Sequence, residues 1–224
     1  MKDKITDDEY HQNLTINENK FQSHLKECDD VIGNLIATLD ELKLLDKTII
    51  IFTSDHGTSF GEKLGERSYG AFVYDYTIKV FCLLYIPNSS QKIIPSQCSS
   101  IDIFPTVMEI AGISLDERCE NILGKSLFGF IHRAENNDRE SFVETGGLDG
   151  LWPSPKKHNV FCIRNNGKKL IYNDTPITWE FYDLIKDPKE TQNIYDESSE
   201  DVLRFKNRLL HYFDILRIKT KLTK

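Results

Sequence analysis

An apolar strand that runs directly into a glycine-rich loop is the feature that most limits how this chain can fold. Thr48–Thr53 (TIIIFT) carries apolar side chains at consecutive positions rather than at alternate ones. That pattern is typical of a strand covered on both faces, as in the centre of a mostly parallel α/β sheet covered by helices. Residues 54–70 then combine glycines with many polar side chains. Because ligand sites of α/β sheets collect where strands end, we expect a functional site directly after Thr53.

The segments on either side of this strand also predict an α/β domain. Before it, apolar residues recur at three- and four-residue spacing, which indicates an amphipathic helix with one stripe packed against a larger body. After it, Ile78–Ile86 predicts a second buried strand, and Ile101–Gly112 predicts a helix entered through Pro105. The helical stripe consists of Leu25, Cys28, Ile32, Leu35, Leu39 and Leu42.

The composition changes after about residue 136. Short β-like segments separated by Gly, Pro and Asn predict a small antiparallel sheet, and a helix-periodic segment follows from about Glu200 to Ile218. We therefore expect three regions: a polar, loosely ordered lead-in at 1–24, an α/β core at 25–135, and the small sheet with its terminal helix at 136–224. The predicted strands are Ser141–Glu144, Val160–Arg164, Lys168–Tyr172 and Trp179–Leu184.

Two acidic segments are predicted to organise the fold rather than to perform chemistry. Asp102 precedes a turn that contains Pro105, and Asp is a favoured capping residue at that position. Asp187, Pro188 and Glu190 predict a turn with local ion pairing.

The net charge of −7 is spread along the chain, which argues against nucleic acid or an anionic membrane as the main partner. No stretch approaches the roughly 18 consecutive apolar residues that a membrane-spanning helix requires, so no span is predicted. The five cysteines form no CxxC pair and no dense disulfide framework. We expect a globular protein in which most cysteines are ordinary core residues.

The Asp55–His56–Gly57 sequence at the end of the strand is the sharpest candidate for chemistry. A carboxylate and a neutral imidazole at one strand terminus can both turn toward a divalent cation, while Gly57 lets the backbone bend away. The alternative is that Asp55 caps the following turn and His56 is an ordinary surface histidine.

Several short segments match one family in that family's order along the chain. They are Asp30–Gly33, Thr48–Gly57, Gly61–Glu62, Gly65–Glu66, Tyr74–Val80, Ser100–Thr106, Gly124–Leu127, Phe181–Leu184 and Asp187–Asn193. Each is weak alone, but their order over most of the chain is specific. The chain resembles the C-terminal half of the sulfatase family, within the alkaline-phosphatase-like superfamily.

The resemblance implies a sulfuric ester hydrolase that attacks a small-molecule or carbohydrate sulfate ester with a formylglycine nucleophile. Asp55 and His56 match family positions that hold a divalent metal, Ca²⁺ rather than Mg²⁺, together with two aspartates from an upstream strand. Lys63, Arg67 and Tyr69 lie in the region where relatives bind sulfate oxygens, although relatives commonly place a Lys or His where this chain has Tyr69 or Ser68. Lys63 and Arg67 also fit a solvated pair beside neighbouring glutamates.

The nucleophile's half of the site is missing from this sequence. No C-x-P-x-R or S-x-P-x-R signature occurs, and the Asp29–Asp30 pair lies on a predicted helix rather than in a strand. We therefore expect a fragment that is inactive alone, whose incomplete sheet leaves an exposed edge capable of self-association.

Two alternatives remain open from the sequence. A phosphomonoester, phosphodiester or phosphonate hydrolase of the same superfamily would need similar stabilisation of a tetrahedral anion. A noncatalytic remnant that acts as a binding module would also lack turnover. The upstream coding region would distinguish all three.

Overall fold

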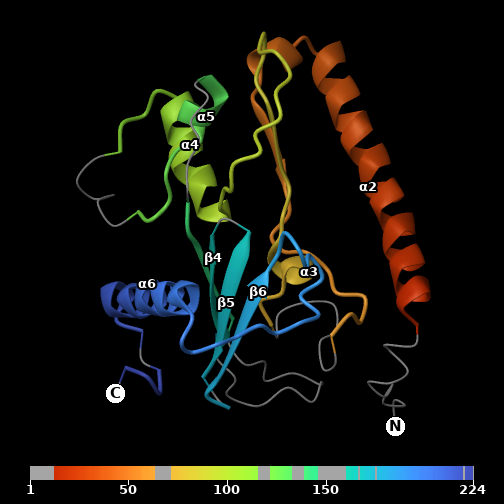
Figure 1. Ribbon diagram of the computed structural model, residues 1–224. Coiled ribbons are helices and arrows are strands. Elements are labelled where there is room, and N and C mark those ends of the chain that lie inside the picture. The colour runs from red at the N-terminus through yellow and green to blue at the C-terminus, as the bar shows by residue number, and fades with distance from the viewer. Residues whose placement is uncertain are drawn as a thin grey trace. The chain divides into compact units, whose positions relative to one another are not determined.

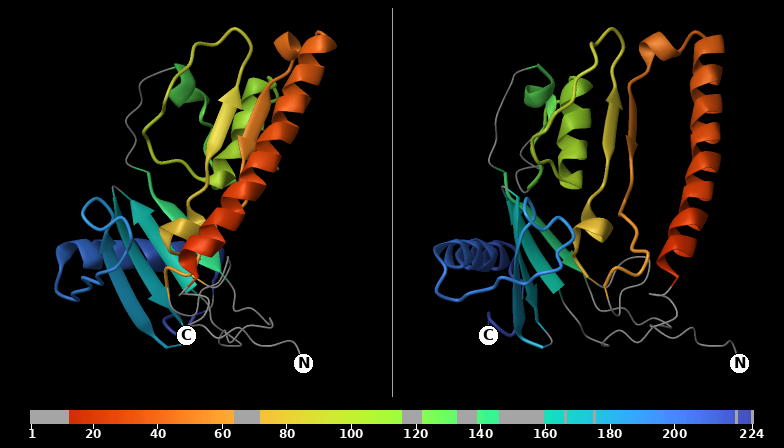
Figure 2. Two further views of the ribbon diagram at one scale, coloured as in Figure 1. Left: turned by 90° about the vertical axis from the view of Figure 1, so that its right-hand side faces the viewer. Right: turned by 45° about the vertical axis from the view of Figure 1, so that its right-hand side comes forward.

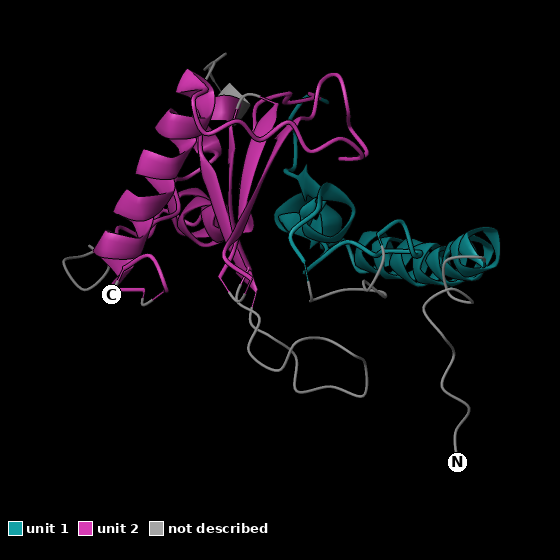
Figure 3. Cartoon of the chain, turned by 60° about the horizontal axis from the view of Figure 1, so that its bottom comes forward, with its two compact units in different colours: residues 1–91, 148–154 teal, residues 92–147, 155–224 magenta. Residues whose placement is uncertain are grey.

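The computed structural model describes residues 13–63, 72–115, 122–132, 139–145, 160–165, 167–174, 176–218 and 220–223. The chain divides into two compact units (Figure 3), residues 1–91 with 148–154 and residues 92–147 with 155–224. Within the described part, no helix is both long enough and apolar enough to cross a membrane.

The first unit combines one long helix with a pair of strands (Figure 1). Its strands β1 (Ile50–Thr53) and β2 (Cys82–Tyr85) pair antiparallel, with Ile50 opposite Tyr85. The parallel arrangement predicted for β1 is therefore not found among the described strands. The reason is local: the connection from β1 returns through the short helix α3 (Asp75–Ile78), whereas parallel neighbours require a full crossover.

Helix α2 (Leu14–Glu41) begins earlier than the sequence predicted. Leu14 and Phe21 extend the apolar periodicity of Leu25 backwards by about three further turns, so part of the expected loose lead-in is helical. Phe21 contacts Phe60, with ring centroids 5.4 Å apart. None of the helix's residues is buried, so the stripe expected to pack against a larger body is uncovered. The one-turn 3₁₀ helix η1 (Leu45–Lys47) leads from α2 into β1.

The second unit contains the predicted antiparallel sheet and terminal helix. The sheet order is β3-β4-β5-β6, every pair antiparallel. Its strand bounds agree closely with those expected from the sequence, which confirms that prediction. The elements are η2 (Ser100–Asp102), α4 (Ile103–Ile110), α5 (Phe128–His132), β3 (Ser141–Thr145), β4 (Val160–Asn165), β5 (Lys168–Asn173), β6 (Thr178–Asp183) and α6 (Glu200–Leu216).

The core of the second unit lies between this sheet and α6. Alternate strand residues and one stripe of the helix interdigitate there, and aromatic rings meet edge to face, as Phe161 and Phe213 do at 4.8 Å. Both views of Figure 2 show α6 against one face of the sheet. The buried members are Phe161, Ile163, Leu170, Tyr172, Phe181, Val202, Phe205, Leu209 and Phe213.

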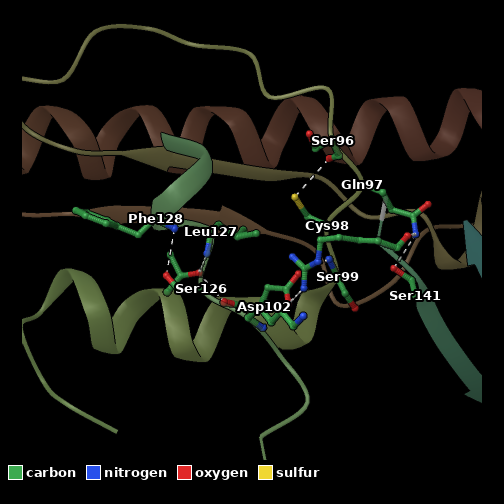
Figure 4. A network of polar contacts seen from close by, with 12 residues as sticks. Ser96, Gln97, Cys98, Ser99, Asp102, Ser126, Leu127, Phe128 and Ser141 are labelled. Carbon is green, nitrogen blue, oxygen red and sulfur yellow. Dashed lines mark hydrogen bonds and ion pairs between the residues drawn. The ribbon is translucent and has the colours of Figure 1, made fainter. Parts of the chain in front are cut away.

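Asp102 organises the loops of this unit (Figure 4). Its buried carboxylate accepts hydrogen bonds from the backbone N–H groups of Ser99 and Lys125, both at 2.8 Å, and from Arg139 Nη2 at 2.7 Å. The bond from Ser99 completes a capping box at η2, and α4 itself receives no side-chain cap. The prediction that Asp102 caps the helix that follows is wrong, because its carboxylate accepts from Ser99 N–H as the third residue of a capping box at η2, whose N-cap is Ser99.

The expectation that most cysteines are core residues is wrong for those that the structure describes. Cys162 is buried, whereas Cys28, Cys82 and Cys98 are exposed. Cys28 lies on the uncovered stripe of α2 and Cys82 begins β2. Two of the three exposed cysteines therefore belong to elements without a buried residue.

Candidate functional site

The loop that follows β1 is held by the segment around α3. Gly57 N–H donates to Thr77 O at 2.7 Å, and a Cβ built on Gly57 would lie 2.2 Å from Tyr76 O. A side chain cannot occupy that space, because the obstructing atom is backbone. Glycine is therefore required here by the close approach of two chain segments, which fixes where the preceding Asp55 and His56 lie.

Asp55 and His56 form a compact pair at the end of β1. The Asp55 carboxylate accepts a hydrogen bond from His56 N–H at 2.9 Å, and its other oxygen lies 3.6 Å from His56 Nε2. His56 Nδ1 lies 2.7 Å from Gly57 O. Because a carbonyl oxygen only accepts, Nδ1 carries the proton in that contact, and in the neutral ring Nε2 carries the lone pair. The lone pair and a carboxylate oxygen are therefore close together.

The two side chains fit part of a divalent metal site. A carboxylate oxygen and an imidazole nitrogen suit such a cation, and a metal-binding histidine usually donates its second ring N–H to a backbone carbonyl or carboxylate, as Nδ1 does here. The Asp55 side chain is 86% exposed and that of His56 39%. Across the residues that the structure describes, no group of three or more His, Cys, Asp or Glu residues is placed to hold a metal ion. Further ligands are required for a complete shell.

Glu62 organises the loop beyond this pair. Its carboxylate accepts hydrogen bonds from Ser59 Oγ at 2.9 Å and from Phe60 N–H at 2.7 Å. Lys63 Nζ lies 4.5 Å from the ring centroid of Tyr74, a cation–π contact. Of the three residues predicted for the sulfate-binding loop, Lys63 is thus placed beside an aromatic ring, whereas Arg67 and Tyr69 lie outside the described residues.

The sequence reasoning missed the positioning role of Tyr76 and Thr77. Thr77 O accepts the Gly57 N–H, and Tyr76 O occupies the space that a side chain at position 57 would need, so two segments about twenty residues apart approach closely. Side-chain identity carries no signal for a bond that the backbone makes. The sequence did point to Gly57, the glycine after the Asp–His pair, but we interpreted it as a residue that lets the backbone bend. In the structure glycine is needed there because another chain segment packs closely against it.

Comparison with known families identifies the chain. Residues 4–113 match the family model described as Sulfatase, and residues 67–212 match the model described as N-sulphoglucosamine sulphohydrolase, C-terminal. The chain therefore belongs to the sulfatase family. The second match covers more than half of the chain and corresponds to the C-terminal region of such proteins.

Individual relatives agree with this assignment. Arylsulfatase K of Mus musculus is 31% identical over 179 residues, which is 78% of this chain and 32% of that protein. N-acetylglucosamine-6-O-sulfatase of Bacteroides thetaiotaomicron is 27% identical over 195 residues, covering 80% of this chain and 33% of that protein. This chain thus spans about a third of the length of the curated relatives it matches.

Solved structures share the fold. A protein in complex with its substrate D-glucosamine-2-N,6-O-disulfate superimposes with a TM-score of 0.68 at 25% identity, covering 83% of this chain and 38% of that chain. The phosphonate monoester hydrolase of Silicibacter pomeroyi gives a TM-score of 0.69 at 22% identity, covering 86% of this chain and 39% of that chain. The described part therefore has α/β content and shares the fold of these structures, and its own described sheets are antiparallel.

Proposed function

We propose that this chain is the C-terminal part of a sulfuric ester hydrolase and supplies half of its metal site. The observation that carries the proposal is the pairing of Asp55 and His56 at the end of β1, with His56 Nε2 3.6 Å from an Asp55 oxygen. A chain of the sulfatase family with this donor pair fits ester hydrolysis better than a binding module, because a binding module has no need for a shared carboxylate and imidazole.

Asp55 and His56 are the residues that would hold the metal. A divalent cation of the kind that sulfatases generally use would neutralise charge that builds on the sulfuryl oxygens. Ca²⁺ suits the exposed carboxylate better than Mg²⁺, since Ca²⁺ accepts many oxygen ligands in flexible geometry. His56 keeps its ring orientation through the 2.7 Å contact with Gly57 O. The nucleophile, a formylglycine, and the remaining carboxylates would come from the part of the enzyme that precedes this chain.

Lys63, Arg67 and Tyr69 are the proposed sulfate-binding residues. Lys63 is held beside the Tyr74 ring, which limits the directions in which its ammonium group can reach. We propose a sulfated carbohydrate as substrate, in keeping with the glucosamine disulfate bound to one structural relative and with the name of the Bacteroides enzyme.

The test uses the intact sulfatase that contains these residues. Asp55→Ala should abolish release of sulfate from a glucosamine sulfate. Asp46→Ala, an exposed acidic residue in η1, is the matched control and should retain turnover. Unchanged turnover in Asp55→Ala would show that Asp55 is not part of the active site. Phosphate and phosphonate monoesters assayed in parallel decide between sulfatase and phosphoesterase activity.

The metal is tested by removal and return. A chelator should inactivate the intact enzyme, and Ca²⁺ should restore activity at lower concentration than Mg²⁺. Equal recovery with either ion would reject the preference for Ca²⁺.

A further inference from the structure

The charge of this chain is divided unevenly along its length. Residues 204–224 contain seven Lys or Arg residues and one acidic residue, Asp214, whereas residues 1–203 contain 21 Lys or Arg and 34 Asp or Glu. The net charge of −7 is therefore made up of +6 in the C-terminal segment and −13 in the rest. Such an asymmetry is typical of a chain whose basic end binds an anionic partner.

Helix α6 arranges part of this charge as a stripe along one face. Arg204, Arg208 and His211 follow one another at i, i+4 and i+7, and all three are exposed. They lie away from the apolar stripe of the helix, which packs into the core of the second unit. The basic stripe is about 10 Å long, at a rise of about 1.5 Å per residue. Arg217, the C-cap residue of α6, and Lys221 are exposed beyond it.

Neither the helix dipole nor local ion pairing fully explains this stripe. The helix has no basic residue in its last turn, where the dipole favours cations. Arg204 shares the carboxylate of Asp201 with Lys168, so one anion serves two cations. Arg208 contacts Glu140 through Nε at 2.9 Å and Nη2 at 2.6 Å. Partly exposed ion pairs are weak in water, so an anion with several charges can compete for both arginines.

We propose that this basic surface, formed by Arg204, Arg208, His211, Arg217 and Lys221, binds a sulfated polysaccharide chain and thereby holds a polymeric substrate. The proposal rests on the proposed function, in which the substrate is a sulfated carbohydrate, and deepens it by making that substrate a polymer. A sulfate group is a tetrahedral anion with several acceptor oxygens. The guanidinium group offers such an anion two parallel N–H donors, which a single ammonium group does not.

An anionic membrane fits this surface less well than a linear polymer. A basic helix that binds a membrane buries its apolar face in the lipid, but the apolar face of α6 is already packed in the core, where Phe213 contacts Phe161. A membrane is also a broad surface. It would repel the 13 net negative charges of residues 1–203, whereas a linear polymer needs to contact the stripe alone.

Single-stranded nucleic acid is also a linear polyanion, but it is bound in a different way. Proteins that bind it combine basic residues with exposed aromatic rings on which the bases stack. The aromatic rings of α6 pack inward instead. Phe205 and Phe213 are buried, and Tyr212 stacks on Phe142 with ring centroids 4.3 Å apart. The arginine stripe therefore favours an anion recognised by hydrogen bonds and charge.

The first experiment measures the binding of the 224-residue chain to heparin, a polysaccharide that contains sulfated glucosamine. The dissociation constant is determined by biolayer interferometry at a series of NaCl concentrations. Binding should weaken steeply as NaCl rises, because a bound polyanion releases its counterions. Hyaluronan, which carries carboxylates but no sulfate, should bind at least about tenfold more weakly. A chain that does not bind heparin at low salt, or binds hyaluronan equally well, would overturn the proposal.

A matched pair of variants locates the surface. Arg204→Gln with Arg208→Gln removes two charges from the stripe and should weaken heparin binding by about tenfold or more. Lys186→Gln with Lys189→Gln removes two charges at other exposed positions of the same unit, and should change binding by less than about twofold. Equal weakening in both variants would mean attraction by overall charge and would reject the surface. Hydrogen exchange in β4 and β5 verifies that each variant is folded.

Two further ligands test the kind of partner. Duplex DNA and vesicles that contain phosphatidylserine are anionic but carry no sulfate. If either binds the chain as tightly as heparin does, the proposal is wrong and the surface belongs to a nucleic acid or a membrane. Weaker binding of both supports a sulfated polysaccharide.

Binding and catalysis fail separately in this design. In the intact sulfatase that contains these residues, Arg204→Gln with Arg208→Gln should raise KM for sulfate release from heparin by about tenfold and leave KM for a glucosamine monosulfate unchanged. An unchanged KM for heparin would overturn the assignment of this surface to the substrate. If the intact parent enzyme releases no sulfate from either compound while the chain still binds heparin, the proposed function is rejected and the binding surface stands.

Discussion

The two sheets that the structure describes differ in what covers them. In β5, every residue from Lys169 to Asn173 is buried, and α6 packs on one face of that sheet. In β1 and β2 no residue is buried, although both strands are more uniformly apolar. Apolar sequence therefore does not by itself produce a core. The second unit carries its own covering layer, whereas the described residues of the first unit leave its strand pair without a buried residue.

The largest expected effect comes from truncating one apolar side chain in each unit and comparing the losses of stability. Phe213→Ala removes a fully buried ring that contacts Phe161 edge to face at 4.8 Å, and should lower the free energy of unfolding of the second unit by about 4 kcal/mol. Leu83→Ala, at a 61% exposed position, should change stability by less than about 0.5 kcal/mol. Denaturation followed by hydrogen exchange in each unit measures both. Equal losses would mean that the strand pair is covered after all.

A buried ion pair distinguishes the second unit further. Lys169 Nζ and Glu190 Oε1 lie 2.8 Å apart, and both side chains are fully buried. Glu190→Gln should cost about 3 kcal/mol, because it leaves a buried ammonium without its counter-charge. The double variant Lys169→Met with Glu190→Leu should recover much of that loss. If the double variant is as unstable as the single one, the pair's geometry rather than the unpaired charge determines stability.

That pair marks the limit of what the sequence could predict. The strands and terminal helix of the second unit follow from local alternation and helical periodicity, so they were predicted closely. Glu190 was expected in a local ion pair, yet its partner Lys169 lies in strand β5. A contact between segments distant in the sequence leaves no periodic signal.

The site shows the same limit. Asp55 and His56 were found from their place after an apolar strand. The hydrogen bond from Gly57 N–H to Thr77 O and the close approach of Tyr76 O depend instead on backbone atoms that the sequence does not identify. The strand that pairs with β1 was predicted, but its antiparallel direction was not, because consecutive apolar residues indicate burial on both faces and say nothing about strand direction.

Two glycines in the first unit provide a matched test of local packing. Gly57→Ala would place a Cβ 2.2 Å from Tyr76 O and should destabilise the loop by about 1–3 kcal/mol. Gly33→Ala adds a methyl group on α2 with nothing within 4 Å, and should stabilise the helix by about 0.5–1 kcal/mol. Exchange of the Gly57 amide, which donates to Thr77 O, reports the first change, and helix content reports the second. A tolerated Gly57→Ala would show that the loop can move away from α3.

Lowering the pH should produce the smallest change in stability, and the change should occur in the second unit. The pKa of Asp196 is lowered because its carboxylate accepts hydrogen bonds from Ser198 N–H at 2.9 Å and Ser198 Oγ at 2.7 Å. The pKa of Asp183 is lowered mainly by the backbone N–H of Lys186. A carboxylate with a lowered folded pKa contributes stability above its unfolded pKa, and this contribution is lost as pH falls through the folded value.

Stability of the second unit should therefore be steady from pH 7 to about pH 5 and fall below about pH 4, near the ordinary aspartate pKa. Asp196→Asn keeps an oxygen acceptor but does not titrate, so the variant should be less stable than the parent at pH 7 and approach it as the pH falls. Thermal unfolding of both proteins across this range measures the difference. A difference that grows toward low pH would have the wrong sign for a carboxylate stabilised by hydrogen bonds, and would place the acid sensitivity of this unit in another group.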